Sequence, residues 1–186
     1  TLLAQMPVQH LLLPTAINTQ REAQLGQSTT DVRRCRTNMW QPWSDDPKMP
    51  IQWRQIALAE AGLSGNNASC IVLLRIYGRQ IMIAGDIEAR AEAELLRQYA
   101  ADLTSDILIA PHHGSNSSST AAFLQRVAPS YVLISAGLHN AFGHPRKVVT
   151  RRYWQLGSHW YNTAQHGQIV VTFAPDGDYQ VQPFLP

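Results

Sequence analysis

The chain has 186 residues and a formal net charge of +2; 45% of its residues are hydrophobic and 15% are charged. This length and composition predict one globular domain with a buried core and exclude a chain that is disordered throughout. No apolar run approaches the roughly 20 residues that a membrane-spanning helix needs, and residues 1–7 lack the pattern of a signal peptide, so we expect a soluble chain. So small a net charge does not by itself indicate a nucleic-acid partner.

The N-terminal part of the chain predicts one strand and a long loop. Residues 1–5 are typical of the end of a helix, and residues 8–14 form an apolar run closed by proline, which predicts a buried strand. Residues 15–50 are mostly polar, and we expect them to form a functional or mobile loop. The arginines within residues 33–36 are interpreted as a solvated surface in preference to a phosphate contact.

The chain contains two cysteines, Cys35 and Cys70. Their separation matches neither a zinc-finger nor a redox motif. Because cysteine is among the residue types that are most often buried, we favour two buried thiols over a disulfide.

The middle of the chain predicts a hairpin and a helix. Residues 52–59 predict a strand, and residues 62–69 are rich in turn-forming residues. Two apolar runs then flank Gly78-Arg79, which predicts a β-hairpin with a two-residue turn of type II′. Residues 88–100 are rich in Ala, Glu, Leu and Arg, with acidic residues first, and this pattern predicts a helix.

Two short apolar strands end in residues that can carry chemistry. Residues 81–85 lead to Asp86, and residues 107–111 lead to His112 and His113. Because a helix lies between the two strands, we expect them to be parallel, with their C-terminal ends side by side. Carboxylate and neutral imidazole are both ligands of divalent metals. The pattern therefore predicts a hydrolytic metal site at this edge of the sheet.

Further α/β structure follows the histidines. Residues 120–128 predict a short helix capped by a preceding hydroxyl group, and residues 131–135 predict another buried strand. Residues 136–145 form a third loop at the same edge, from which His144 is expected to face the site. Residues 159–186 predict two or three strands with a Pro-Asp-Gly turn between them.

The last predicted helix starts at Pro145 and ends before Gly157. Lys147, Arg151 and Trp154 share one of its faces. A basic stripe that includes an aromatic ring is suited to follow a phosphate backbone. An ordinary solvated helix face explains the same pattern equally well.

Five motifs of the chain, in their order and spacing, resemble the metallo-β-lactamase-like domain of ComEC-type DNA-uptake proteins. The likeness covers most of the chain from Gly65 onward. The motifs are Asn66-Asn-Ala-Ser69, Gly85-Asp86-Ile-Glu88, Pro111-His-His-Gly-Ser115, Ser135-Ala-Gly137 and Phe142-Gly-His-Pro145.

This resemblance implies an α/β fold, namely a metallo-β-lactamase-like αβ/βα sandwich with a metal site along one edge of its two sheets. In the family this C-terminal domain is attached to a membrane channel that passes one DNA strand, and it is thought to hydrolyse the other. The resemblance therefore implies a metal-dependent nuclease that degrades the non-transported strand during natural transformation. DNA and the channel portion of the same polypeptide are the implied partners. The implied location is the periplasmic side of the inner membrane.

The resemblance also implies roles for single residues. Asp86, His112 and His113 match metal-ligand positions, and the implied cofactors are two divalent ions, Zn²⁺ or Mn²⁺. The candidate catalytic residues are Asp86, His112 and His144. The candidate residues for binding phosphate or DNA are Asn67, Ser115, His144, Lys147 and Arg151.

The sequence departs from the family pattern in one respect. The family carries an early His-x-Asp-x-Asp-His motif after its first strands, and nothing like it occurs here. Residues 1–186 are therefore expected to be a fragment of the metallo-β-lactamase-like domain, incomplete at its N-terminus. Without the early ligands two metals would be held poorly, so we expect the fragment alone to lack them and to be inactive.

Other functions agree with the same residues. One is a metal-free module that guides DNA through residues 33–36 and the stripe of Lys147 and Arg151. Another is a hydrolase of the same fold that acts on a small ester. Each candidate site residue also has a structural interpretation: Asp86 as the cap of the following helix, and one of the paired histidines as a donor to a backbone carbonyl.

Overall fold

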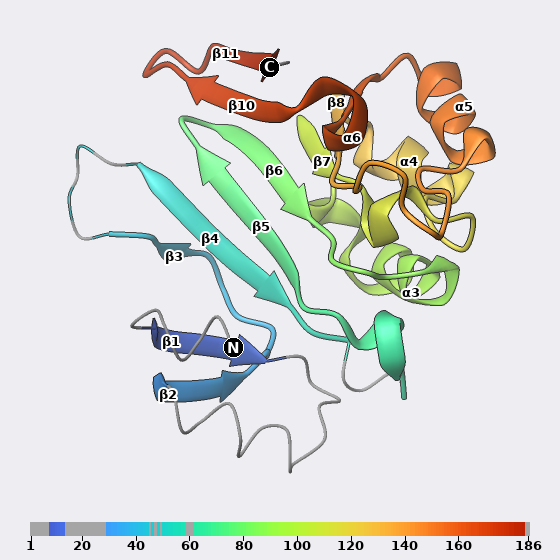
Figure 1. Ribbon diagram of the computed structural model, residues 1–186. Coiled ribbons are helices and arrows are strands. Elements are labelled where there is room, and N and C mark those ends of the chain that lie inside the picture. The colour runs from blue at the N-terminus through green and yellow to red at the C-terminus, as the bar shows by residue number, and fades with distance from the viewer. Residues whose placement is uncertain are drawn as a thin grey trace.

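The computed structural model describes residues 8–13, 29–44, 46, 48, 50–58 and 62–184. The helix end expected at residues 1–5 lies outside these ranges. At the centre is a seven-stranded sheet with the strand order β3-β4-β5-β6-β7-β8-β9 (Figure 1). Two further pairs, β1 with β2 and β10 with β11, form separate two-stranded sheets.

The strands follow the apolar runs of the sequence. Strand β1 confirms the strand predicted at residues 8–14, and β4 confirms most of the strand predicted at residues 52–59. The strands are β1 (Val8–Leu13), β2 (Thr29–Arg34), β3 (Gln41–Pro42), β4 (Ile51–Ile56), β5 (Ile71–Ile76), β6 (Arg79–Ile83), β7 (Ile107–Ile109), β8 (Tyr131–Ile134), β9 (His159–Asn162), β10 (Gln168–Phe173) and β11 (Tyr179–Phe184).

Helices α3, α4 and α5 lie along one side of the sheet (Figure 1). The expected caps are present at two of them. The Thr120 hydroxyl accepts a hydrogen bond from the Phe123 amide at the start of α4, and Gly157 ends α5 in the left-handed conformation. Within the described ranges no helix has the length and apolarity needed to span a membrane. The α-helices are α3 (Ala89–Tyr99), α4 (Ala121–Val127), α5 (Lys147–Leu156) and α6 (Thr163–His166).

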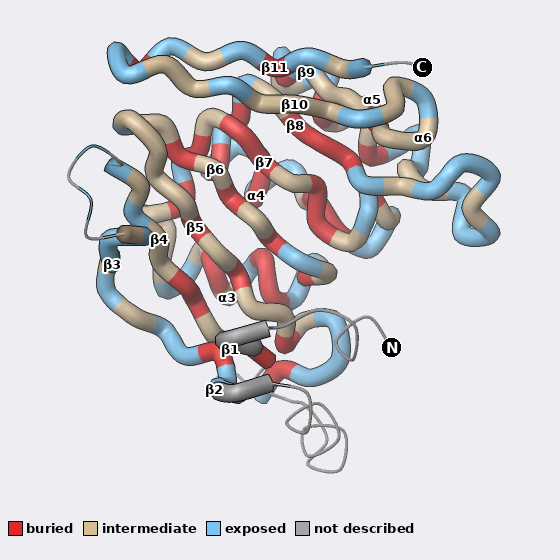
Figure 2. Tube along the Cα trace, turned by 60° about the vertical axis from the view of Figure 1, so that its left-hand side comes forward, coloured by how far each residue is buried: buried red, intermediate tan, exposed pale blue. Residues whose placement is uncertain are grey.

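The sheet divides its side chains between two faces, as the period of a strand requires. In β7, Leu108 packs into the core beneath the helices, whereas Ile107 and Ile109 pack toward Val181 of the β10–β11 pair. Buried residues run along β7 and β8 in Figure 2. The molecule therefore has three layers: helices, the seven-stranded sheet and a smaller sheet.

The pairing of the strands changes from antiparallel to parallel at β6. Strands β3 to β6 are joined by antiparallel pairings, whereas β6, β7, β8 and β9 pair in parallel. The predicted parallel relation of the strands before Asp86 and His112 is confirmed. Because parallel strands place their C-terminal ends at one edge, the loops after β6, β7 and β8 come together there.

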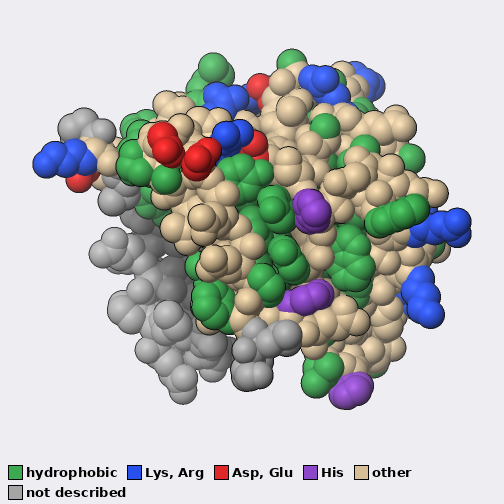
Figure 3. All heavy atoms as spheres, turned by 90° about the horizontal axis from the view of Figure 1, so that it is seen from above, with side chains coloured by type: hydrophobic (Ala, Val, Ile, Leu, Met, Phe, Trp, Pro, Cys, Tyr) green, Lys and Arg blue, Asp and Glu red, His purple; other side chains and the backbone are tan. Residues whose placement is uncertain are grey.

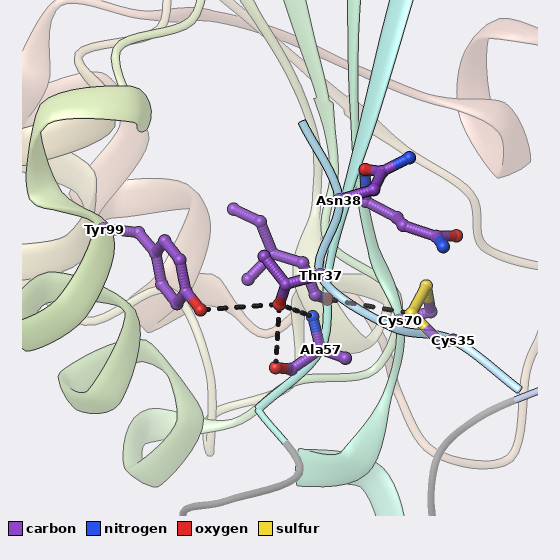
Figure 4. Close-up of a disulfide and its surroundings, with 8 residues drawn as sticks. Cys35, Thr37, Asn38, Ala57, Cys70 and Tyr99 are labelled. Carbon is purple, nitrogen blue, oxygen red and sulfur yellow. Dashed lines mark hydrogen bonds between the residues drawn. A yellow bond between two sulfur atoms is a disulfide. The ribbon is translucent and has the colours of Figure 1, made fainter. Parts of the chain in front are cut away.

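The prediction of two free thiols is wrong, because Cys35 and Cys70 form a disulfide with a Cα–Cα distance of 5.8 Å (Figure 4). The segment after β2 runs beside the end of β4, where the Thr37 hydroxyl donates to the Ala57 carbonyl over 3.2 Å and accepts from the Ala57 amide over 3.1 Å. This path brings Cys35 to the start of β5. The disulfide depends on this path of the chain in the folded structure, so the spacing of the cysteines in the sequence does not predict it.

The prediction of one long loop over residues 15–50 is wrong in part. Strand β2 pairs in parallel with β1, and β3 pairs with β4. These strands have polar side chains at many positions, so the hydrophobic period that usually indicates a strand is weak. Residues 14–28 lie outside the described ranges.

The hairpin between β5 and β6 is confirmed, but its turn differs from the prediction. The two turn residues are Tyr77 and Gly78, and both have positive φ, at 48° and 81°. Positive φ at both positions defines a type I′ turn, not type II′. A tyrosine in the left-handed region is uncommon, which is why the sequence placed the turn one residue too late.

Pro145 does not begin helix α5, contrary to expectation. It follows a cis peptide bond with His144, and the helix starts at Lys147. Pro145 instead packs against the turn after β7: a Cβ placed on Gly114 would lie 2.7 Å from the Cβ of Pro145. The Arg146 amide also donates to the Gly114 carbonyl over 2.9 Å. The proline therefore joins two loops of the site.

Candidate functional site

The loops after β6 and β7 bring Asp86 and the paired histidines together. The His112 amide donates to the Gly85 carbonyl over 3.0 Å, which holds the two loops side by side. Asp86 Oδ1 lies 3.6 Å from His113 Nε2, and both side chains are about half exposed to solvent, at 45% and 50%. The expected convergence of a carboxylate and an imidazole at this edge is therefore present in the structure.

His113 is held in one orientation by a backbone carbonyl. Its Nδ1 lies 2.7 Å from the Ser135 oxygen at the end of β8. A carbonyl only accepts hydrogen bonds, so Nδ1 carries a proton, and Nε2 is the nitrogen that faces Asp86. The structural interpretation, in which one of the paired histidines donates to a carbonyl, is correct for His113. The same bond is the usual support of a metal-binding imidazole.

His112 faces a different set of groups. Its Nδ1 lies 3.2 Å from Glu88 Oε1 and 3.4 Å from the Ser117 hydroxyl. Ser117 in turn donates to Glu88 Oε1 over 2.9 Å. This Ser117 hydrogen bond is the largest cause that lowers the pKa of Glu88, with further contributions from Asn66, His112 and Asn67, so the carboxylate stays charged. A charged acceptor at Nδ1 leaves Nε2 of His112 as the free nitrogen.

His144 completes the edge from the loop after β8. Its ring centroid lies 5.9 Å from that of His112, and the Asn140 side chain bonds both the amide and the carbonyl of His144, each over 2.8 Å. In the part of the chain that the structure describes, the buried Nδ1 of His144 has no hydrogen-bond partner. Burial, and then the neighbouring His112, Arg146 and His113, lower the pKa of His144, so its ring is neutral.

The donor set fits part of a metal shell. His113 Nε2 and Asp86 Oδ1 lie close together, and imidazole nitrogen and carboxylate oxygen are both ligands of divalent metals. Two ligands of one tetrahedral Zn²⁺, at bond lengths of about 2.1 Å, lie about 3.4 Å apart. The observed separation of 3.6 Å is close to that value. Among the described residues, however, no group of three or more His, Cys, Asp or Glu side chains is placed to hold one ion.

Comparison with known proteins gives sequence relatives but no matching family model. The chain is 40% identical over 113 residues to the uncharacterized protein YcaI of Escherichia coli, a match that spans 61% of this chain and 15% of that protein. It is 31% identical over 122 residues to competence protein ComA of Neisseria gonorrhoeae, spanning 65% of this chain and 17% of ComA. It is also 30% identical over 110 residues to ComE operon protein 3 of Bacillus subtilis, spanning 59% of this chain and 14% of that protein.

The chain is a relative of the ComEC-type competence proteins. Its matches cover about one sixth of the length of these proteins. The ComEC-type resemblance drawn from the five motifs is thus confirmed, and it concerns one segment of much longer relatives.

The ComEC-type resemblance predicts that Asn67 and Ser115 bind phosphate. In the structure both side chains make hydrogen bonds with other residues of the chain. Asn67 Oδ1 accepts from the Glu88 and Ala91 amides over 3.0 and 3.1 Å and so caps helix α3, while its Nδ2 donates to Glu88. Asp86 does not cap that helix. The Ser115 hydroxyl lies 3.1 Å from that of Ser117. A phosphate contact by Asn67 or Ser115 stays a prediction, and so does one by Lys147 or Arg151, which are exposed on α5.

Two residues of the site, Glu88 and Ser117, carry no role in the sequence-based prediction. Glu88 follows the ComEC-type Gly-Asp pair at the start of a helix, where an acidic residue is already explained by the helix dipole. Ser117 lies in a run of hydroxyl residues that offers no means to select one of them. Only the folded loops show that both bond to His112.

Proposed function

We propose that the chain is part of the metallo-β-lactamase-like domain of a ComEC-type protein and that, in the whole protein, this domain hydrolyses phosphodiester bonds of DNA with the help of a divalent metal. The observation that carries this proposal is the approach of Asp86 Oδ1 to His113 Nε2, 3.6 Å apart where two parallel strands end. The names of ComA and ComE operon protein 3 support a role in competence, and hence in DNA uptake. The three-layered architecture is consistent with an α/β sandwich.

Asp86 and His113 would hold the metal, and the other ligands would come from groups outside this pair. A divalent cation there supplies Lewis-acid activation of a water molecule and neutralises charge on the reacting phosphate. The Ser135 carbonyl holds the His113 ring with Nε2 toward Asp86. Glu88 and Ser117 hold Nδ1 of His112, which leaves its Nε2 free for a ligand.

His144 has a role that follows from its neutral ring. With a lowered pKa it carries no second proton near neutral pH, so it is a poor proton donor to a leaving oxygen. One N–H of a neutral imidazole still donates a hydrogen bond. We therefore assign His144 to hold a phosphate oxygen beside His112, in preference to a role as the acid.

The disulfide supports an extracytoplasmic location for the domain. Disulfides persist in oxidising compartments such as the periplasm and are rare in the cytosol. Cys35 and Cys70 are paired here. In our proposal the domain lies on the outer side of a membrane-bound uptake machinery, where it meets incoming DNA.

The test combines metal binding with DNA cleavage. Calorimetric titration of the whole natural protein with Mn²⁺ or Zn²⁺ is expected to give saturable binding that Asp86→Asn weakens at least tenfold. Cleavage of labelled DNA by the whole natural protein is expected to require the same metal and to be lost in Asp86→Asn. Asp102→Asn is the matched control, because Asp102 pairs with Arg54 away from the site. Cleavage that Asp86→Asn leaves undiminished would refute the proposal.

A second candidate function is a metal-free module that guides DNA. The observation in its favour is that Lys147 and Arg151 are exposed on α5, next to the loop of His144. DNA binding with no metal binding and no cleavage in the whole protein would favour this candidate. Cleavage of a chromogenic ester in place of DNA would favour the small-ester hydrolase.

A further inference from the structure

Acidic and basic residues are distributed unevenly along the chain, and the stretch that carries the histidines of the site is basic. Residues 107–175 contain no Asp or Glu. In Figure 3 the Asp and Glu side chains gather at the upper left, with Lys and Arg beside them, whereas the right-hand side, where α5 lies, shows Lys and Arg without Asp or Glu. Such a surface favours an anionic partner. The basic residues of this stretch are Arg126, Arg146, Lys147, Arg151 and Arg152.

An aromatic ring is exposed within this basic surface. Phe142 is 71% exposed, on the loop between β8 and α5. Its ring is stacked on that of His144, with centroids 5.8 Å apart and planes inclined by 15°. One face of the Phe142 ring is thus held by a histidine of the site, and its high exposure leaves the other face open to solvent.

The exposed ring is joined to the candidate metal ligands through a row of rings. The centroids follow one another at 5.8 Å from Phe142 to His144, 5.9 Å from His144 to His112 and 6.4 Å from His112 to His113. The loop is fixed at its base, because the Arg146 amide donates to the Gly114 carbonyl. Phe142 is therefore held at a set distance from the site.

A cation lies beside the loop that carries Phe142. A Cβ placed on Gly143, the residue after Phe142, would lie 3.4 Å from Arg146 Nη1, so the guanidinium rests against the loop. Lys147 follows at the start of α5. Flat rings next to cations are the usual elements of a site for single-stranded nucleic acid: the ring stacks on a base and the cation contacts the backbone.

We propose that Phe142 is a base-stacking residue that, with Arg146 and Lys147, makes the site selective for unpaired nucleotides. This inference rests on the proposed action on DNA and adds the form of DNA that is bound. In a duplex both faces of each base are covered by neighbouring bases, so an exposed ring such as Phe142 stacks only on bases that are unpaired. The basic residues alone would bind paired and unpaired strands alike.

The test measures binding of fluorescent oligonucleotides by the intact protein, with EDTA present so that no cleavage occurs. The ligands are a single strand, an abasic strand of the same length and a duplex. Phe142→Leu is expected to weaken binding of the single strand about tenfold and to leave the abasic strand unchanged. Trp43→Leu is the matched control: Trp43 is 61% exposed but follows β3, at the opposite edge of the sheet from β9.

The basic residues give a second, independent measurement. Lys147→Gln is expected to weaken the normal and the abasic strand equally and to lower the dependence of affinity on salt concentration by about one phosphate contact. Lys48→Gln, a change at an exposed lysine between β3 and β4, is the control and is expected to have no effect.

Several results would overturn the inference. They are no binding of the single strand by the wild type, an equal loss on the abasic strand in Phe142→Leu, or the same loss in Trp43→Leu. Binding of vesicles that contain anionic phospholipid, without binding of DNA, would show a membrane surface instead. Because every measurement is made in EDTA, a failure of metal-dependent cleavage leaves these results intact, and the two proposals fail separately.

Discussion

The strand-end edge around Asp86 and the junction between helices α3 and α4 differ in how completely their polar groups are paired. At the junction Glu92 is fully buried, and its two carboxylate oxygens accept the amides of Ser119 and Thr120. At the edge, the Asp86 carboxylate accepts no hydrogen bond within the described ranges, and His113 Nε2 lies 3.6 Å from its Oδ1. The junction holds the fold together, whereas the edge keeps its polar atoms available to a ligand.

The buried junction extends beyond Glu92. The Ser119 hydroxyl lies 2.7 Å from the hydroxyl of the buried Tyr153, and Arg152 donates to the Ser118 and Ser119 carbonyls, each over 3.1 Å. Burial raises the pKa of Glu92 and also that of Tyr153. The network therefore fixes the hydroxyl-rich loop between the histidines and α4, and with it the Ser117 that supports His112.

The largest effect is expected from Glu92→Ala. The change leaves two amides at the start of α4 without their charged acceptor, so we expect the free energy of unfolding to fall by roughly 3–5 kcal/mol. Urea denaturation followed by circular dichroism measures it. Glu94→Ala on the same helix is the control: Glu94 pairs with Arg97 near the surface, where such pairs add little. Equal losses in the two variants would contradict the comparison.

The raised pKa of Glu92 also predicts a pH dependence. The unfolded chain releases this proton near pH 4.5, and the folded chain holds it to higher pH. The folded state thus binds more protons between these two values, so stability falls as pH rises from about 4.5 through the raised pKa. Relative to Glu92→Gln, which has no carboxyl group, the wild type should lose stability across this range. Parallel pH profiles of the two proteins would refute the shift.

The disulfide is expected to have the next largest effect. Cys35 and Cys70 are separated by 35 residues, and removing the cross-link of a loop of this size costs about 4 kcal/mol of stability. The double variant Cys35→Ala with Cys70→Ala should show this loss in urea denaturation. Dithiothreitol should lower the stability of the wild type to the same level and leave the double variant unchanged. A wild type that is insensitive to the reductant would show that the bond is not formed.

A smaller loss is expected from Asn67→Ala. It removes the cap of α3, where one side-chain oxygen serves two amides, and a lost cap costs about 1–2 kcal/mol. Asn116→Ala is the control, because Asn116 is exposed on a loop. If Asn67 instead binds phosphate without stabilising the helix, thermal unfolding in the absence of DNA will be unchanged and only the affinity for DNA will fall.

The smallest effect on stability is expected from Asp86→Asn. The carboxylate is about half exposed and accepts no hydrogen bond within the described ranges, so in metal-free buffer the free energy of unfolding should change by less than about 0.5 kcal/mol. Thermal unfolding in EDTA measures it. A loss comparable to that of Glu92→Ala would place Asp86 among the residues that hold the fold and would remove the contrast between the two regions.

Much of the seven-stranded sheet follows from the sequence because its later strands are apolar runs bounded by turn residues. The strands before Asp86 and before the histidines are both apolar runs of this kind. Because a helix lies between them, the sequence also predicts that they are parallel. The convergence of Asp86 with His112 and His113 follows in turn from strand ends that share one edge. Local sequence patterns are sufficient to predict a helix or strand when its apolar residues follow the period of that element.

Other features depend on contacts that no local pattern records. The Cys35–Cys70 bond requires the segment after β2 to run beside β4. Glu92 lies in a helix whose one other acidic residue, Glu94, is closer to the surface, and nothing in its sequence neighbourhood indicates full burial. The fixed orientation of His113 depends on the Ser135 carbonyl, which belongs to the next strand and has no side-chain signature.

The backbone of the His-His-Gly turn affects which substitutions are informative. His112, His113 and Gly114 have φ values of 47°, 55° and 78°, three successive residues in the left-handed region. Asparagine, like histidine, is enriched in that region, whereas alanine adopts it less readily. An alanine scan would therefore change the ring and the chain path together. Asparagine at position 112 or 113 removes the imidazole while preserving the turn, so it isolates the chemistry of the ring from the shape of the loop.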